Sequence, residues 1–349
     1  MDSSYRKDDV VLLLKDITGL VEPLPTAERE RFIQSGTHYS EMLPLEYKPS
    51  DDYIKIYENS LDVFGQITAD AIARVSDKIV KVKGNDVVIV SLARAGTPLG
   101  VLIRRYIRKK YNIECPHYSV SIIRDRGIDR NAIKYILGRH TAKNIQFLDG
   151  WTGKGVIYKE LKKEIAYFEN VSPELAVVAD PAYLTELCGT HEDILIPSSC
   201  LNSTVSGLIS RTFLRRDIIG ANDFHGAAYY NELAAEDRTN EFIDYIESLF
   251  RYNLLPEGST SDSVGLEEVK RLSTVYGIAN LNYIKPGIGE TTRVLLRRVP
   301  WKVIIDHRYN GSRELCHIIQ LAKEKAVEIE YTDIKNYKCC GIIKQFSDI

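Results

Sequence analysis

The stretch "FLDGWTGKG" (residues 147–155) brings together an acid, a hydroxyl, an ammonium group and backbone amides free of bulky side chains. Asp149 ends an apolar run, so its carboxylate is expected at the tip of a strand, where it can accept from hydroxyl groups. The small-residue loop that follows opens a helix, an arrangement that binds phosphate. It is not a Walker A loop, because glycine rather than serine or threonine follows the lysine. The loop consists of Thr152, Gly153, Lys154 and Gly155.

A second turn with anion-binding chemistry is "SLARAGTPLG", after the apolar run at 87–92. Its guanidinium and its flexible Ala-Gly pair can face an anion at the start of a helix. Two such turns, each after a strand, predict one ligand with two phosphate groups, such as ribose phosphorylated at both ends. The alternatives are two ordinary strand–turn–helix joints and a surface cation. The anion-binding residues of this turn would be Arg94, Ala95, Gly96 and Thr97.

Two further polar segments are candidates for chemistry. In "IIRDRGIDRNA" (residues 122–132), Arg124 and Arg126 could close over a ligand and neutralise a leaving pyrophosphate, or they could belong to a solvated charge run. In "SGTHYSEML", His38 and Glu41 could act as acid and base, or the segment could simply be a capped loop. We favour a hood over the substrate for this second segment.

Cys200 is the candidate for a different chemistry. It lies between "ILIPSS" and "LNSTVSGL", near an expected helix start, where the pKa of a thiol tends to fall. His225 in "DFHGAAYY" could serve as its base, which would give a Cys–His hydrolase. Otherwise Cys200 is a small buried residue, and the hydroxyl-rich loop around it holds part of a ligand. The sequence does not place the two residues together and shows no local signature of a cysteine protease.

Short apolar runs must position these residues. Such runs suit strands buried on both faces, and helical segments separate several of them, so we predict a doubly wound α/β sheet. The expected order along the chain is a helical hood region at 1–85, a core with a helical extension at 86–284, and a small α/β domain at 285–349, after the break "IKPGIGE". The expected core strands cover 87–92, 118–123, 145–148, 175–179 and 194–196.

Composition favours no particular partner for the chain as a whole. It has 349 residues and a net charge of −2, but residues 291–349 carry 11 basic and 7 acidic residues, a weak indication of nucleic-acid binding. No apolar run is long enough to span a bilayer. The six cysteines form no CxxC pair and no zinc-site spacing, which favours reduced thiols in the cytoplasm.

Taken together, these motifs resemble known families. The two loops are similar to the pyrophosphate and ribose-phosphate loops of type I phosphoribosyltransferases. A closer likeness covers nearly the whole chain through "HYSEMLP", "IPSSCLNSTVSGLISRT", "DFHGAAYY" and "KPGIGETTRVLLRRVPW". These stretches resemble the family of tellurite-resistance and stress gene clusters that is labelled cysteine protease StiP. That family joins a type I phosphoribosyltransferase-like domain to a C-terminal Pelota-like (L7Ae-type) RNA-binding domain.

The resemblance implies an enzyme that binds phosphoribosyl pyrophosphate with Mg²⁺ held through the substrate. Ribosyl phosphate would pass to a small nitrogenous acceptor, with Asp149 holding the ribose and pyrophosphate leaving. The family loop carries two adjacent acids where this chain has Asp149 and Gly150, so a regulator that binds without reacting is an alternative. A homodimer and RNA binding are further expectations. The implied RNA-binding residues are Lys285, Arg293, Arg297 and Arg298.

Overall fold

The core of the protein is a parallel β-sheet. The computed structural model describes residues 1–255 and 264–344. The sheet order is β1-β4-β3-β6-β7-β8, every neighbouring pair on this path is parallel, and β5 (Gly127–Ile128) adds antiparallel to β4. The predicted fold class, a parallel α/β sheet with flanking helices and a small C-terminal α/β domain, is confirmed. The sheet strands are β1 (Val11–Leu13), β3 (Val88–Ala93), β4 (His117–Ile123), β6 (Ile145–Trp151), β7 (Leu175–Ala179) and β8 (Cys188–Thr190).

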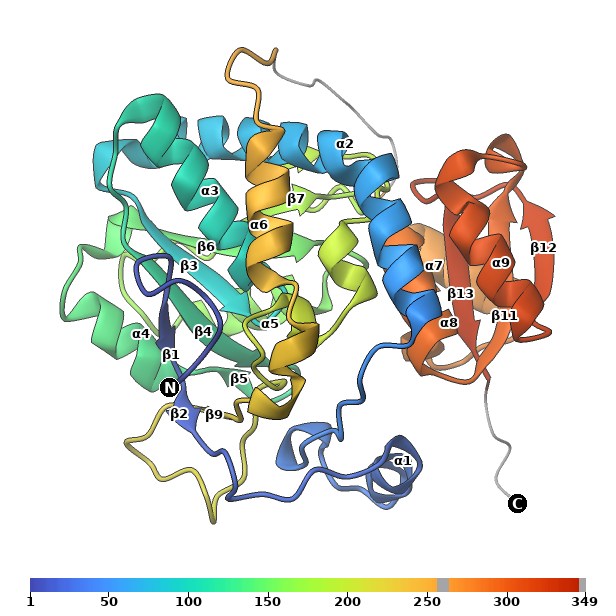
Figure 1. Cartoon of the computed structure of the whole chain (residues 1–349), viewed down its shortest axis with the longest axis horizontal. Coiled ribbons are helices and arrows are strands. Elements are labelled where there is room, and N and C mark those ends of the chain that lie inside the picture. The colour runs from blue at the N-terminus through green and yellow to red at the C-terminus, as the bar shows by residue number, and fades with distance from the viewer. Residues whose placement is uncertain (256–263, 345–349) are drawn as a thin grey trace.

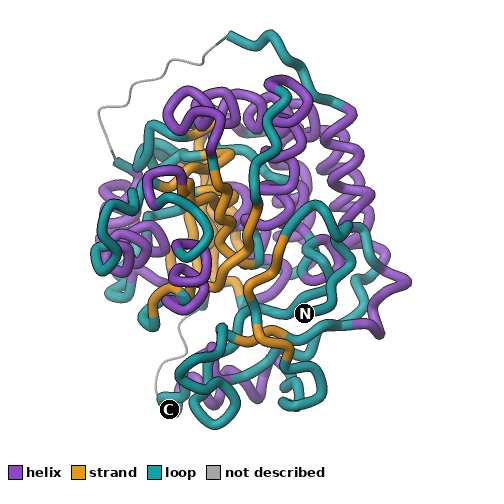
Figure 2. Tube along the Cα trace, turned by 90° about the vertical axis from the view of Figure 1, so that its left-hand side faces the viewer, coloured by secondary structure: helices purple, strands orange, loops and turns teal. Residues whose placement is uncertain are grey.

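Helices cover both faces of this sheet, so the strands run through the middle of the molecule (Figure 2). One apolar cluster joins the sheet to α2 (Asp51–Lys83), α3 (Gly96–Tyr111) and α6 (Thr239–Ser248). The other joins it to α4 (Arg130–Leu137) and α5 (Val156–Ile165). In the described residues, no helix combines the length and the apolar character that crossing a membrane requires.

The structure differs from the sequence prediction at two places in the core. Residues 194–196 are buried but form no strand, and the edge strand is β8 instead. The expected hood region also contributes β1 to the sheet beside β4. The remaining short elements of this part are β2 (Lys15–Asp16), which pairs with β9 (Gly226–Ala227), and α1 (Thr26–Gln34).

The C-terminal domain is a four-stranded sheet with helices packed against it (Figure 1). Its sheet order is β10-β13-β11-β12. Helix α7 (Gly265–Val275), which the sequence assigned to the core extension, contributes Val269 and Leu272 to the apolar cluster of this domain. The other elements are β10 (Ile284–Pro286), α8 (Ile288–Arg297), β11 (Pro300–Asp306), α9 (Cys316–Glu324), β12 (Glu328–Thr332) and β13 (Cys339–Ile343).

Hydrogen bonds dock the C-terminal domain onto the core. Asp193 is buried, and its two carboxylate oxygens accept from the backbone N–H groups of Ile288 (2.9 Å) and Lys338 (2.8 Å). Tyr337 donates to the carbonyl of Gly153 at 2.6 Å. The first half of α2 lies beside this domain (Figure 1), where Tyr53 donates to the carbonyl of Leu296. The loop after β6 is therefore part of the interface between the two domains.

Replacing Asp193 with alanine should weaken this docking. The substitution leaves two buried N–H groups without acceptors, so we expect the free energy of unfolding to fall by about 2 to 4 kcal/mol. Urea unfolding at neutral pH measures the change, with Glu186→Ala at an exposed site as the control. A D193A protein as stable as E186A would show that Asp193 does not hold the domains together.

Candidate active site and adjoining cleft

The loops predicted to bind anions meet in one cleft of about 1090 Å³. The cleft lies at the carboxyl ends of β3, β4 and β6, the edge at which parallel α/β sheets bind ligands. The loops touch, because a Cβ added at Gly96 would lie 2.8 Å from the carbonyl oxygen of Leu148. The predicted site residues that line the cleft are Arg94, Ala95, Arg124, Asp149, Thr152, Gly153, Lys154, Gly155, Cys200, Lys285, Arg293 and Arg298.

Several predicted anion ligands already have protein partners. Arg94 donates to the Glu46 carboxylate at 3.0 Å, so its charge is neutralised within the cleft wall. Burial alone would raise the pKa of Glu46, but the Arg94 charge and bonds from Ser203 outweigh it, and that pKa is lowered. Thr97 is fully buried, and its hydroxyl shares a 2.7 Å hydrogen bond with that of Ser119.

The expected loop and hood residues contact each other. Arg126 donates to the Glu41 carboxylate at 2.5 Å, so the two predicted segments form an ion pair. His38 shares a 2.8 Å hydrogen bond with the Ser40 hydroxyl, which suits a capping role. The side chain of Arg297, a predicted RNA ligand, lies outside the described part of the chain.

Two ionisable groups at the end of β6 and in the loop after it have shifted pKa values. Burial raises the pKa of Asp149 to about 6, against the opposing effects of the Gly150 N–H group and Arg293. Burial and the charge of Lys285 lower the pKa of Lys154 to about 8. Lys154 also donates to two backbone carbonyls just before α8, those of Leu281 and Ile284. The loop lysine therefore holds the C-terminal domain while it lines the cleft.

The structure gives Cys200 and His225 different partners. The Cys200 thiol is buried at the cleft wall and donates to the Ser60 hydroxyl at 3.8 Å. The His225 imidazole shares a 2.9 Å hydrogen bond with Ser121, and its backbone N–H donates to Asp129. His225 does not line the cleft. The pairing of these two residues as nucleophile and base therefore gains no support from the hydrogen bonds.

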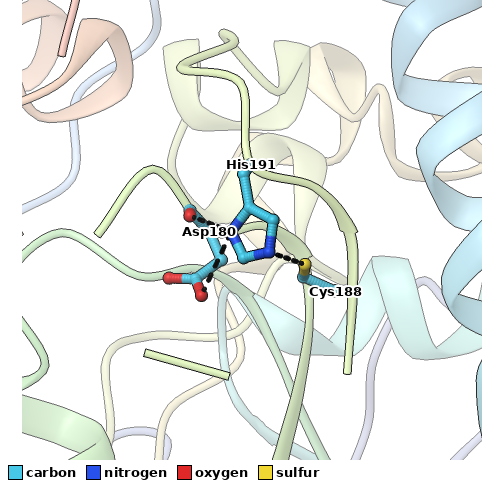
Figure 3. Close-up of side chains that lie close together, drawn as sticks. All are labelled: Asp180, Cys188 and His191. Atoms are coloured by element: carbon cyan, nitrogen blue, oxygen red, sulfur yellow. Dashed lines mark hydrogen bonds and ion pairs between the residues drawn. The ribbon is translucent and has the colours of Figure 1, made fainter. Parts of the chain in front are cut away.

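A different cysteine does have an imidazole partner. Strands β7 and β8 pair with Ala179 opposite Thr190, so the residues that follow, Asp180 and His191, become neighbours. The Cys188 Sγ lies 3.3 Å from the Nε2 atom of His191 (Figure 3). On the other side of the ring, Nδ1 lies 2.9 Å from the Asp180 carbonyl oxygen and 3.6 Å from its Oδ2 atom.

The surroundings fix this cluster in place. Tyr183 stacks on the His191 ring with centroids 4.2 Å apart and planes 6° apart. Asp180 is completely buried, which raises its pKa, and it accepts from the Thr152 hydroxyl and from two backbone N–H groups, those of Leu184 and Thr185. Because Thr152 lines the cleft, a single side chain separates the cleft from the Asp180 carboxylate.

The cluster could also hold a metal ion, since Asp180, Cys188 and His191 each offer a ligand atom within 4.8 Å of the others. A tetrahedral zinc site needs its ligand atoms to converge on one point. Here the thiol lies at Nε2 and the aspartate at Nδ1, on opposite sides of one imidazole (Figure 3). That arrangement is typical of a nucleophile, a base and a group that orients the base.

The sequence prediction missed this cluster. Its only local sign is cysteine and histidine separated by two residues, with an aspartate directly after the apolar run at 175–179. The spacing alone has no specific meaning. It acquires one when the β7–β8 register brings the aspartate beside the histidine.

The raised pKa of Asp149 predicts a pH-dependent effect of Asp149→Asn. Folding favours the protonated carboxyl, so the stability that Asp149 contributes is full below about pH 4 and is lost as the pH rises through about 6. Asparagine stays neutral, so relative to wild type D149N should gain about 2 kcal/mol of unfolding free energy between pH 4 and pH 7. Urea unfolding at both pH values measures the gain. A difference that stays constant with pH would contradict the shifted pKa.

Comparison with known proteins adds the family. Residues 3–247 match a family model described as "Tellurite-like stress resistance cysteine protease StiP". Residues 263–345 match the PELOTA RNA binding domain. A relative named "Cysteine protease StiP", from Acinetobacter baylyi, is 35% identical over 364 residues, which cover 98% of this chain and 94% of that protein.

The solved structures found include a hypoxanthine-guanine and a hypoxanthine phosphoribosyltransferase. One from Bacillus anthracis has a TM-score of 0.26 at 13% identity over 35% of this chain and 71% of its own. One from Trypanosoma cruzi, complexed with the product IMP, has a TM-score of 0.27 at 13% identity over 57% of this chain and 93% of its own. At TM-scores this low, these structures do not show the function of this chain.

The expected phosphoribosyltransferase activity, with phosphoribosyl pyrophosphate as substrate, is therefore wrong. Both the family model and the relative that spans the whole chain carry the name of a cysteine protease. Mg²⁺ was expected only as an ion held through that substrate, and its binding stays an untested prediction. The chain belongs to the StiP family, described as tellurite-like stress resistance cysteine proteases.

Proposed function

We propose that this protein is a cysteine-dependent hydrolase of amide bonds, with Cys188 as nucleophile and His191 as general base. The observation that carries the proposal is the 3.3 Å contact between the Cys188 sulfur and His191 Nε2. Membership of the StiP family supports cysteine chemistry without naming the residue.

The hydrogen bonds suit the proton transfers of this reaction. Nδ1 donates to the Asp180 carbonyl, which leaves Nε2 with a lone pair facing the thiol. Cys188 gives its proton to Nε2 as its sulfur bonds to the substrate carbonyl carbon. The imidazolium then passes that proton to the leaving amine as the C–N bond breaks. Water, activated by the same imidazole, hydrolyses the thioester and restores the thiol. The buried Asp180 carboxylate stabilises the imidazolium.

Access to the sulfur is the main constraint on this mechanism. Cys188 is 1% exposed, whereas the His191 side chain is 12% exposed. A substrate must therefore approach from the imidazole side, and Tyr183, which covers one face of that ring, must move away for it to do so. The alternative nucleophile, Cys200, lies at the cleft wall but has no histidine among the residues that line the cleft.

RNA binding is a second proposed function, favoured by the match of residues 263–345 to an RNA-binding domain. Three of the predicted RNA ligands, Lys285, Arg293 and Arg298, lie at the cleft. The cytoplasmic location stays a prediction, supported by six cysteines of which none forms a disulfide. The homodimer also stays a prediction.

Replacing Cys188 with alanine should abolish hydrolysis. We expect hydrolysis of fluorescein-labelled casein to fall about a thousandfold or more in C188A, and by a factor on the order of 10² to 10⁴ in H191A. Casein serves as a general substrate, and the rate of fluorescence increase measures the reaction.

The matched controls are Cys115→Ala and Cys200→Ala, which truncate buried thiols outside the Asp180–Cys188–His191 cluster. Both should keep casein hydrolysis within about threefold of wild type, since a core methylene-sized change mainly affects stability. Full activity in C188A, with loss in C200A, would contradict the assignment. One equivalent of zinc per chain, lost in C188A, would instead make the cluster a metal site.

A further inference from the structure

The cleft has a strong excess of positive charge. Nine of the residues that line it are arginine or lysine and three are acidic, a formal excess of six positive charges in a chain whose net charge is −2. The acidic residues are Glu46, Asp149 and Glu290. One of them, Glu46, forms an ion pair with Arg94. A concave surface of one sign focuses its potential and attracts ligands of the opposite sign.

Three of these cations have no carboxylate partner within residues 1–255 and 264–344. Lys285 and Arg211 form no ion pair, and Lys154 donates only to backbone carbonyls. Burial and the neighbouring guanidinium groups of Arg29 and Arg94 lower the pKa of Arg211 to about 10. Burial also lowers the pKa of Lys285, helped by Arg298 and Arg124 and opposed by Glu290. The fold thus holds like charges together at a cost that an anionic ligand would offset.

Aromatic side chains lie beside some of the cations. The Arg293 guanidinium lies 4.4 Å from the centre of the Trp151 ring, and that of Arg211 lies 5.0 Å from the Tyr39 ring. Tyr47 also lines the cleft and is 65% exposed. Cations that follow a backbone and aromatic rings that stack on bases are the combination that binds single-stranded nucleic acid.

The cleft is built from both domains and is large. Lys154 and Arg211 come from the core, whereas Lys285 and Arg293 come from the segment that matches the RNA-binding domain. Its volume of about 1090 Å³ exceeds the upper end of the range for one drug-sized ligand. The unstacked bases of a single strand can enter such a cleft and offer their faces and edges to its side chains, whereas the paired bases of a duplex are stacked on one another.

We propose that a single-stranded segment of RNA binds in this cleft, with its phosphates on Lys154, Arg211 and Lys285 and a base stacked on Trp151. The inference rests on the RNA binding proposed above and extends the site into the core domain. Lys154 keeps one N–H donor for a phosphate, because two of its three are directed to carbonyls. Bound RNA would contact both domains and so stabilise their docking.

Fluorescence anisotropy with a labelled single-stranded RNA of twelve uridines tests the charges. For the full chain in moderate salt, R211Q and K285Q should each weaken binding about fivefold or more and reduce the salt slope by about 0.7. The matched controls remove exposed lysines outside the cleft, one from each domain, as Lys159→Gln and Lys323→Gln. K154Q is measured as well. The result for R211Q is decisive, because Arg211, unlike Lys154, does not hold the C-terminal domain to the core.

The two tryptophans provide a second measurement, the quenching of their fluorescence by RNA, which charge alone would not change. In Trp301→Phe only Trp151 emits, and RNA should quench it. In Trp151→Phe only Trp301 emits, and RNA should leave its emission unchanged.

Cleft variants that bind RNA like wild type, with no quenching, would overturn the cleft site and leave RNA binding by the C-terminal domain standing. No binding by wild type would overturn both. Equal displacement of the RNA by uridine monophosphate or by poly-glutamate would reassign the cleft to a small phosphate or an acidic peptide.

Discussion

Parallel pairing places the ends of the strands at one edge of the sheet, and each candidate site depends on that constraint. The β6 end carries Asp149 and Thr152 at the cleft, and the β7 and β8 ends carry Asp180 and His191 beside it. The hydrogen bond from Thr152 to Asp180 joins the two regions. The cationic cleft and the cysteine–histidine cluster are therefore adjacent parts of one edge. The loop after β6 borders both, since Thr152 bonds to Asp180, and its Gly153 carbonyl accepts from Tyr337 of the C-terminal domain.

The two loops that were predicted to bind anions show that a loop motif alone does not determine a function. Arg94 stands at the predicted turn, but Glu46 neutralises it, and Lys154 holds two carbonyls of the chain itself. A loop motif fixes where a turn can form, whereas the function depends on which side chains remain available to a ligand. Among the described residues, the cleft cations without an acidic partner come from both domains. Neither of the two predicted loops supplies all of them.

The sequence predicted what short-range patterns determine. The apolar runs became β3, β4, β6 and β7 because continuous apolar segments between helices suit strands buried on both faces. It did not predict β8, which has three residues, or the Asp180–His191 contact, which the pairing of two strands creates. The ion pair of Arg94 with Glu46, far apart in the chain, was equally hidden. Cys200 was chosen for its place near an expected helix start, whereas the cysteine whose sulfur lies beside an imidazole is Cys188.

The proposed hydrolysis requires His191 to activate the sulfur of Cys188. The most direct measurement is the rate at which iodoacetamide alkylates each cysteine of the native protein, followed by mass spectrometry, with exposed Cys316 as the internal reference. Only a thiolate reacts at a useful rate. We expect Cys188 to be labelled faster than buried Cys115, and His191→Ala to remove this advantage while labelling of Cys316 stays the same. Labelling of Cys188 no faster than that of Cys115, in wild type and variant alike, would contradict this expectation.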